Sequence, residues 1–172
     1  VIIHLGMSGR LKITKPNVVL NKHDHLVFKF NNLKLIFNDT RRFGFIDIIN
    51  SNKVNNISYI KKLGIDALDD KLSTDYLFNK FKNSQVLIKQ LLLNQCILAG
   101  IGNIYACEIL YDAKISPLRK GNSLKKSHIG TILKSSRKIL RKAIKHGGSS
   151  INDYVSPDGI LGNFQKNFRV YG

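Results

Sequence analysis

Short, partly alternating apolar runs dominate the first 50 residues of the chain, and they predict β-strands. Residues 25–30 and 33–37 are runs of the kind found in half-buried strands. Asn31 and Asn32 join these runs, and asparagine tolerates the positive φ of a tight hairpin turn. Residues 42–49 predict a further strand. The segment therefore predicts an antiparallel sheet that is part of a sandwich or barrel.

From Ser73 onward the apolar residues follow the period of an α-helix instead. Ser73 or Thr74 can cap a helix that runs to about residue 82. A second helix is predicted for residues 86–95 and a third for residues 103–113. The segment 99–102 contains two glycines and must separate these two helices.

The longest predicted helix lies between residues 123 and 146, because apolar residues recur there at the spacing of one helix face. Gly147 and Gly148 end it. The apolar stripe consists of Ile129, Ile132, Leu133, Leu140, Ala143 and Ile144. Together these patterns predict an α+β fold. An incomplete antiparallel β-sandwich covers residues 1–60, a connector covers 61–72, and a helical domain covers 73–172.

The charge of the chain points to a polyanionic partner. Its formal net charge is +17 and its pI is about 10.0, more than solubility requires. Nucleic acid is the first candidate and an anionic membrane surface the second. No run approaches the roughly 20 apolar residues that a spanning helix needs, and the first residues do not have the pattern of a signal peptide. We therefore expect a cytoplasmic, nucleic-acid-binding protein with no membrane partner.

Basic residues are not balanced by acidic ones in part of the helical region. Residues 113–152 contain no Asp or Glu, whereas Lys and Arg occupy the predicted outer face of the long helix. The missing acidic partners favour contact with phosphates over a merely solvated face. The two cysteines, Cys96 and Cys107, form no C-x-x-C pair, and their apolar surroundings predict buried, inert thiols rather than metal ligands.

The segment Gly100-Ile-Gly-Asn-Ile-Tyr105 is the sharpest candidate for phosphate binding. Its two glycines allow a tight turn, and their amides can point at one anion. The helix predicted to start near Asn103 adds its positive dipole end. The Asn103 side chain can either cap that helix or donate its amide to a phosphate oxygen. Taken alone, this short motif is more often a plain turn between two helices.

The surrounding residues resemble the helix-two-turn-helix of the formamidopyrimidine-DNA glycosylases. That resemblance starts from the segments 90–95, 99–110 and 114–117. It extends, in order, over 4–11, 22–25, 39–44, 164–165 and 170–172, and so over essentially the whole chain. It implies a bacterial, monomeric enzyme with an N-terminal β-sandwich, a helical domain and a C-terminal zinc finger. Double-stranded DNA would lie in the cleft between the domains.

The resemblance implies two sets of DNA-contacting residues. Met7, Arg41 and Phe43 would fill the gap left by an extruded base, with Arg41 donating to the unpaired cytosine. The residues near the DNA backbone or lesion would be His4, His23, Arg41, Arg42, Lys89 and Asn103. Met7 or Phe43 alone would more often be a core residue. Either histidine alone would more often form a structural hydrogen bond.

Residues 147–154 resemble the start of the loop that closes over an extruded oxidised purine. The implied lesion-loop residues are Gly148, Ser149, Ser150 and Tyr154. Glycines give such a loop mobility, and its backbone amides can donate to a purine oxygen. The alternative interpretation of this stretch is a flexible connector.

The catalytic nucleophile and the zinc ligands of the family are expected outside this sequence. The family nucleophile is an N-terminal proline followed by glutamate, whereas the prolines here are Pro16, Pro117 and Pro157. The zinc-finger cysteines are expected after Gly172. We therefore expect no catalytic residue, no metal ligand and no activity in this chain by itself. One structural zinc is expected in the full-length protein.

The sequence thus predicts a base-excision DNA glycosylase with abasic-site lyase activity. Its substrates would be 8-oxoguanine and formamidopyrimidines in duplex DNA. One alternative is a glycosylase of the endonuclease VIII type, which acts on oxidised pyrimidines. Another is a non-enzymatic RNA-binding module such as a ribosomal helix-two-turn-helix protein. A third is a degenerate gene product that binds DNA without catalysis.

Overall fold

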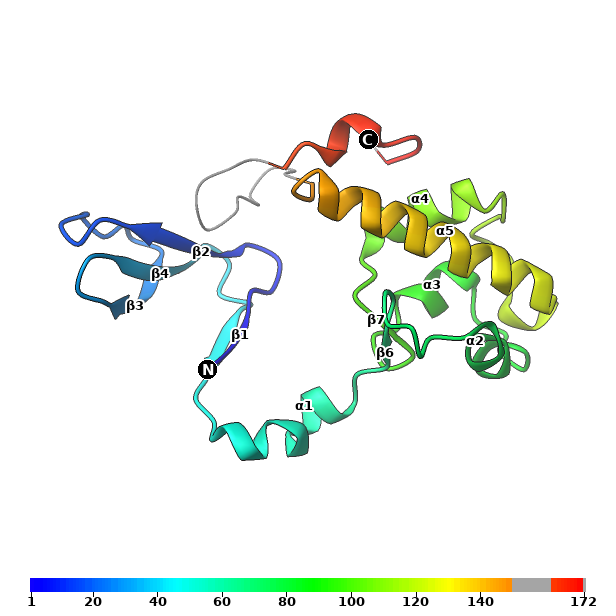
Figure 1. Cartoon of the computed structure of the whole chain (residues 1–172), viewed down its shortest axis with the longest axis horizontal. Helices are drawn as coiled ribbons and strands as arrows, with labels where there is room; N and C mark the ends of the chain where they lie inside the picture. The colour runs from blue at the N-terminus through cyan, green and yellow to red at the C-terminus, as the bar shows by residue number, and fades with distance from the viewer. Residues whose placement is uncertain (150–161, 172) are drawn as a thin grey trace. The chain divides into compact units, whose positions relative to one another are not determined.

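The chain folds into two compact units, each built from two separate stretches of sequence. A computed structural model describes residues 1–149 and 162–171 (Figure 1). Unit 1 contains Val1–Val54 and His146–Lys166, and unit 2 contains Asn55–Lys145 and Asn167–Gly172. The α+β class predicted from the sequence is confirmed, with antiparallel sheets in unit 1 and helices in unit 2.

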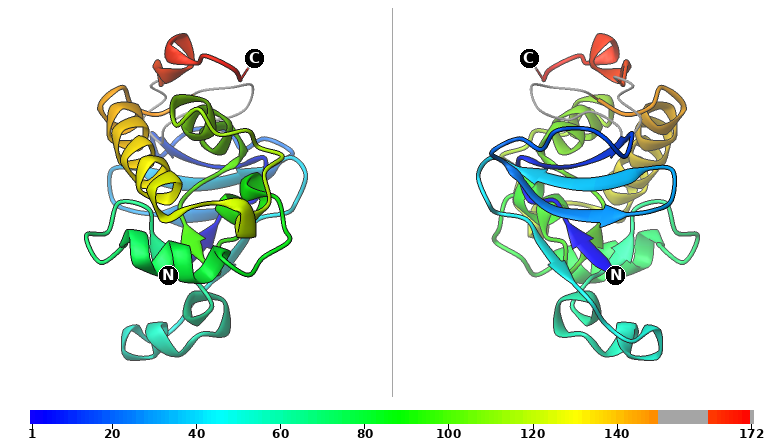
Figure 2. Two further views of the ribbon diagram at one scale, coloured as in Figure 1. Left: turned by 90° about the vertical axis from the view of Figure 1, so that its right-hand side faces the viewer. Right: turned by 90° about the vertical axis from the view of Figure 1, so that its left-hand side faces the viewer.

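Unit 1 contains two antiparallel sheets. β1 (Ile2–His4) pairs with β5 (Phe45–Asp47). β4 (Lys34–Asp39) lies between β2 (Gly9–Thr14) and β3 (Asp24–Lys29), so the second sheet has the order β2-β4-β3 (Figure 2). The central strand is the buried one, with Ile36 wholly inaccessible to solvent. The strand predicted for residues 42–49 is shorter, because Arg42 has a left-handed backbone (φ 57°) that cannot continue a strand.

The predicted hairpin between β3 and β4 is confirmed, but its turn is of another type. The amide of Phe30 donates to the carbonyl of Leu33 at 2.9 Å, and Lys29 pairs with Lys34. Neither Asn31 nor Asn32 has a positive φ. The turn is therefore not the primed type that the sequence predicts.

Unit 2 is mainly helical. It contains α1 (Ser58–Lys61), α2 (Thr74–Phe81), α3 (Ile88–Leu93), α4 (Asn103–Asp112), η2 (Gly121–Ser123) and α5 (Lys126–Lys145). The predicted cap of α2 is confirmed, since the Ser73 hydroxyl accepts the Tyr76 amide at 3.1 Å. The 3₁₀ segment η1 (Ser51–Asn56) leads into this unit, and η3 (Phe164–Asn167) leads back to it. α3 is shorter than predicted.

The long helix α5 packs against α2 and α4 (Figure 1). Its predicted apolar stripe is confirmed except at one end. The buried hydrophobic residues are Ile129, Ile132, Leu133, Ile139, Leu140 and Ala143. Ile144 is 65% exposed, so its place in the stripe is wrong. It lies in the last turn, about 40° around the helix from Leu140, at the edge of the packed face.

Residues 61–72, for which the sequence predicts a connector, contribute to the core of unit 2. Within them β6 (Ile65–Asp66) pairs in parallel with β7 (Leu98–Ala99). Ala67 and Leu72 are buried. This segment therefore holds the turn before α4 against the rest of the unit.

The C-terminal stretch of unit 2 is tied to α4 by one buried carboxylate. Glu108 is 4% exposed. Its oxygens accept the backbone amides of Arg169, Val170 and Tyr171, each at 3.0 Å. Residues 169–171 are thereby fixed to the middle of the helix.

Candidate nucleic-acid interface

Met7, Arg41 and Phe43 lie together on the surface of unit 1. An Arg41 guanidinium nitrogen is 3.6 Å from the Met7 sulfur, and the guanidinium carbon is 4.8 Å from the centre of the Phe43 ring. Met7 is 73% exposed and Phe43 is 56% exposed. Two large apolar side chains in such positions do not serve the core. The core-packing alternative is therefore wrong for both.

A buried aspartate joins the two loops that carry these side chains. Met7 lies between β1 and β2, and Arg41 and Phe43 lie between β4 and β5. Asp39, at the end of β4, accepts the Ser8 hydroxyl at 2.6 Å. The hydrogen bond from Ser8 holds the pKa of the Asp39 carboxyl below its ordinary value, and loop amides act in the same direction against burial.

The other expected DNA contacts of unit 1 lie beside these loops. His4 is exposed on β1 and stacks on Phe45, with ring centres 5.2 Å apart. Arg42 is exposed and follows Arg41 directly. The half-buried His23 accepts the Asp39 amide through its backbone carbonyl at 3.0 Å. His25, which the sequence did not mark as a DNA contact, forms a structural hydrogen bond: its Nε2 is 2.7 Å from the Asp39 carbonyl oxygen.

In unit 2, the turn before α4 leaves Asn103 free to act outside the helix. Gly100 has a left-handed backbone (φ 90°), and Gly102 is the residue before the first turn, without a side-chain cap. Asn103 is exposed at the first helical position and does not cap the helix. Of the two roles predicted for Asn103, donation to an anion is the one that this geometry allows. The first-turn amides of α4 point in the same direction.

Gln95 braces this turn, a role that the sequence did not reveal. Its side-chain oxygen accepts the Gly100 amide at 3.0 Å, and its side-chain nitrogen donates to the Ile101 carbonyl at 2.8 Å. One amide group thus spans the glycine turn. The only sequence signal was a polar residue at the end of an apolar run.

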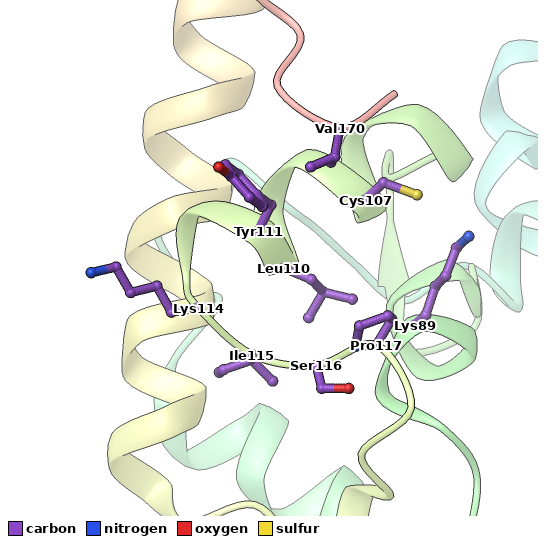
Figure 3. A pocket seen from close by; sticks show the side chains of 9 residues that line it. All are labelled: Lys89, Cys107, Leu110, Tyr111, Lys114, Ile115, Ser116, Pro117 and Val170. Atoms are coloured by element: carbon purple, nitrogen blue, oxygen red, sulfur yellow. The ribbon is translucent and has the colours of Figure 1, made fainter. Parts of the chain in front are cut away.

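Lys89 lies on α3 at the rim of an apolar pocket in unit 2. The pocket has a volume of about 460 Å³. Figure 3 shows the Lys89 amine pointing away from its centre, so that charge is available outside the pocket. The lining residues are Lys89, Cys107, Leu110, Tyr111, Lys114, Ile115, Ser116, Pro117 and Val170.

The cysteine prediction is wrong for Cys96. Cys96 is exposed in the turn between α3 and β7, where its amide donates to the Asn94 side chain at 3.0 Å. Cys107 is half-buried. Within residues 1–149 and 162–171 no group of three or more His, Cys, Asp or Glu side chains could hold a metal ion. In the same residues no helix is long and apolar enough to cross a membrane.

The basic side chains of α5 are not all without acidic partners. Lys138 is 2.7 Å from Asp112 of α4, and this contact holds the pKa of the Asp112 carboxyl below its ordinary value. Lys126 pairs with Asp75 of α2. The expectation of an unpartnered basic helix is therefore wrong at these two positions. The partners come from helices outside the acid-free stretch.

The lesion-loop residues are only partly described. Ser149 forms an antiparallel bridge with Asn163, and the Phe164 amide donates to the Gly148 carbonyl at 3.0 Å. These contacts join the two ends of the loop. Ser150 and Tyr154 lie outside the described residues.

Known protein families match the chain in both units. Residues 63–155 match the family described as the formamidopyrimidine-DNA glycosylase H2TH domain, and residues 1–46 match its N-terminal domain. The match at residues 1–46 disfavours the ribosomal alternative, because a ribosomal helix-two-turn-helix protein has no β-sheet domain before its helices. Among curated relatives, the formamidopyrimidine-DNA glycosylase of Zymomonas mobilis is 44% identical over 99% of this chain and 63% of its own length. That of a Wolbachia species from Drosophila simulans is 44% identical over 100% and 63%.

Solved structures give the same result. A Lactococcus lactis FPG mutant in complex with Fapy-dG containing DNA is 37% identical, with a TM-score of 0.92. Lactococcus lactis Fpg with abasic-site DNA is 37% identical, with a TM-score of 0.91. Each alignment covers 99% of this chain and 62% of the other. The chain thus spans somewhat under two thirds of the proteins it matches, and it belongs to the formamidopyrimidine-DNA glycosylase family.

Proposed function

We propose that this chain is part of a base-excision DNA glycosylase that acts on oxidised purines in duplex DNA. The observation that carries the proposal is the exposed cluster of Met7, Arg41 and Phe43. Extruding a base from the duplex costs a few kcal/mol of stacking and pairing. Apolar side chains that enter the gap restore part of that contact. The guanidinium beside them can offer paired donors to the base left opposite.

Phosphate binding would come from both units. Arg42 lies between Arg41 and Phe43 in the sequence, and His4 of β1 pairs with Phe45 of β5, two residues after Phe43. In unit 2 the Asn103 side chain and the first-turn amides of α4 would donate to a phosphate, and Lys89 would add positive charge. The net charge of +17 supports this assignment, because phosphate contacts dominate the affinity of DNA-binding proteins.

The preference for oxidised purines rests on the relatives. Solved structures similar to this chain contain Fapy-dG DNA, abasic-site DNA, and carbocyclic 8-oxo-G DNA bound to MutM. The curated relatives named above are formamidopyrimidine-DNA glycosylases, which favours oxidised purines over the oxidised pyrimidines of the endonuclease VIII type. The lesion loop that begins at Gly148 would close over the extruded base.

Abasic-site lyase activity and the structural zinc belong, in this proposal, to the whole enzyme. The family nucleophile is an N-terminal proline, and this sequence has proline only at positions 16, 117 and 157. A polypeptide of residues 1–172 should therefore form no borohydride-trapped adduct with an 8-oxoguanine duplex. A covalent protein–DNA adduct in that assay would refute this part of the proposal.

A binding experiment tests the proposed function directly. The 172-residue chain is titrated with an undamaged duplex and with a duplex that holds a tetrahydrofuran abasic analogue opposite cytosine. We expect tighter binding to the second duplex, because the gap is already open. Phe43→Ala should reduce that preference, whereas Lys61→Ala, which replaces an exposed residue of α1, should not. Equal affinity of the unsubstituted chain for both duplexes would contradict the proposal.

A further inference from the structure

The carboxylate of Asp39 accepts several hydrogen bonds beneath the exposed cluster of Met7, Arg41 and Phe43, which we call the base-gap cluster. The residue is fully inaccessible to solvent. One oxygen accepts the Ser8 hydroxyl at 2.6 Å and the Arg41 amide at 3.2 Å, and the other accepts the Gly44 amide at 2.8 Å. The Ser8 hydroxyl in turn accepts the Arg41 amide at 3.1 Å. All these donors come from the two loops that carry Met7, Arg41 and Phe43.

We propose that Asp39 is a positioning residue that fixes the spacing of the base-gap cluster before DNA binds. It would act through the backbone of the two loops and would not touch DNA itself. The inference rests on the proposed function, because it assigns a role to the cluster named there. Its consequence is that recognition of the opposite base depends on a buried carboxylate as well as on Arg41.

The two loops are in backbone contact, which leaves little freedom to compensate for a lost bond. A Cβ atom added at Gly44 would lie 2.6 Å from the His4 carbonyl oxygen. One added at Gly6 would lie 2.8 Å from the Phe43 carbonyl carbon. Arg42 has a left-handed backbone, which non-glycine residues adopt only when their surroundings hold them. Its amide also helps to hold the pKa of the Asp39 carboxyl below its ordinary value.

An amide in place of this carboxylate cannot satisfy the same donors. The two oxygens of Asp39 both face N–H or O–H groups. Asparagine would turn an NH₂ group toward one of these sites, whichever way its amide is oriented. The variant Asp39→Asn therefore preserves shape and removes at least one bond that holds the loops.

Asp24 provides a matched control in the same sheet. Its side chain is 1% exposed and lies 2.6 Å from the Lys12 amine. It also accepts the Asn38 amide at 2.7 Å and the Asn21 backbone amide at 2.8 Å. Like Asp39 it is a buried, hydrogen-bonded carboxylate, but its partners are not in the loops of the cluster. Asp24→Asn therefore reports the general cost of losing such a group.

The experiment compares Asp39→Asn, Asp24→Asn and the unsubstituted chain. Affinities are measured for duplexes with a tetrahydrofuran site opposite cytosine and opposite adenine. We expect Asp39→Asn to reduce the cytosine-to-adenine affinity ratio by about tenfold, which lies toward the lower end of the range for one base contact. Asp24→Asn should leave the ratio unchanged, even if both affinities fall. An unchanged ratio in Asp39→Asn would overturn the proposal.

Two further measurements keep the proposal testable if Asp39→Asn does not fold. Ser8→Ala removes one donor and should lower the same ratio by a smaller factor; an unchanged ratio would overturn the proposal. Hydrogen exchange of the free chain should show slow exchange at the Arg41 and Gly44 amides, accelerated by Ser8→Ala. Fast exchange at these amides in the unsubstituted chain would also overturn it. Absence of any lesion preference would instead contradict the proposed function, and the exchange rates would still decide the role of Asp39.

Discussion

Replacing Arg41 with alanine should change which base is accepted opposite the lesion more than it changes DNA binding in general. The guanidinium is exposed and lies against the Met7 sulfur and the Phe43 ring. At an exposed site such a cation–π contact contributes about 0.5–1 kcal/mol, enough to orient the side chain. Paired donors on a base edge contribute about 1–3 kcal/mol of discrimination. Arg41→Ala should therefore reduce the cytosine-to-adenine affinity ratio by about 5- to 150-fold.

Asn103→Ala is the control that separates a loss of base discrimination from a general loss of DNA binding. Asn103 lies at the first position of α4, where a phosphate contact would carry no base information. Dissociation constants of both variants are measured for abasic-analogue duplexes with cytosine or adenine opposite. Asn103→Ala should weaken both complexes by the same factor. If the two variants have the same effect on the ratio, Arg41 is one more backbone contact and the reasoning is refuted.

Three further predictions concern charge and stability. The logarithm of the DNA association constant should fall with the logarithm of salt concentration with a slope of about −0.9 per phosphate neutralised. An affinity that barely changes with salt would contradict a phosphate-dominated interface. Folding lowers the pKa values of Asp24, Asp39 and Asp112, so the stability they contribute is present above their ordinary pKa and is lost as pH falls through the lowered values. Urea unfolding should accordingly show a loss of stability below about pH 4, and a flat profile down to pH 2.5 would refute this. Glu108→Ala should destabilise unit 2 by about 3–5 kcal/mol, because it leaves several amides of residues 169–171 without an acceptor. An unfolding midpoint equal to that of the unsubstituted chain would show that this clamp is dispensable.

Features that depend on nearby residues could be predicted from the sequence. The Ser73 cap is such a case, because its signal lies within one helical turn. The β3–β4 hairpin was predicted as well, although its turn type was not, because φ at Asn31 and Asn32 depends on how the strands twist. The role of Phe43 could be named only through the family resemblance, since an apolar side chain beside a strand otherwise indicates the core.

Features that depend on distant partners could not be predicted. The exposure of Ile144 and Cys96 is set by where neighbouring elements end, which apolar spacing does not encode. The partners of Lys126 and Lys138 come from helices outside the acid-free stretch. Asp39 belongs to a motif that was recognised, yet its role required knowing that Ser8 and Gly44 meet at its carboxylate.

The interleaving of the two units along the chain has a consequence for how the protein folds as it is made. Residues 1–54 are synthesised before residues 55–145, but the unit they belong to also contains residues 146–166. The second unit likewise begins at residue 55 and is completed by residues 167–172. Neither unit is therefore complete before most of the other has been synthesised. Unit 1 is therefore completed only after the helical region has been synthesised.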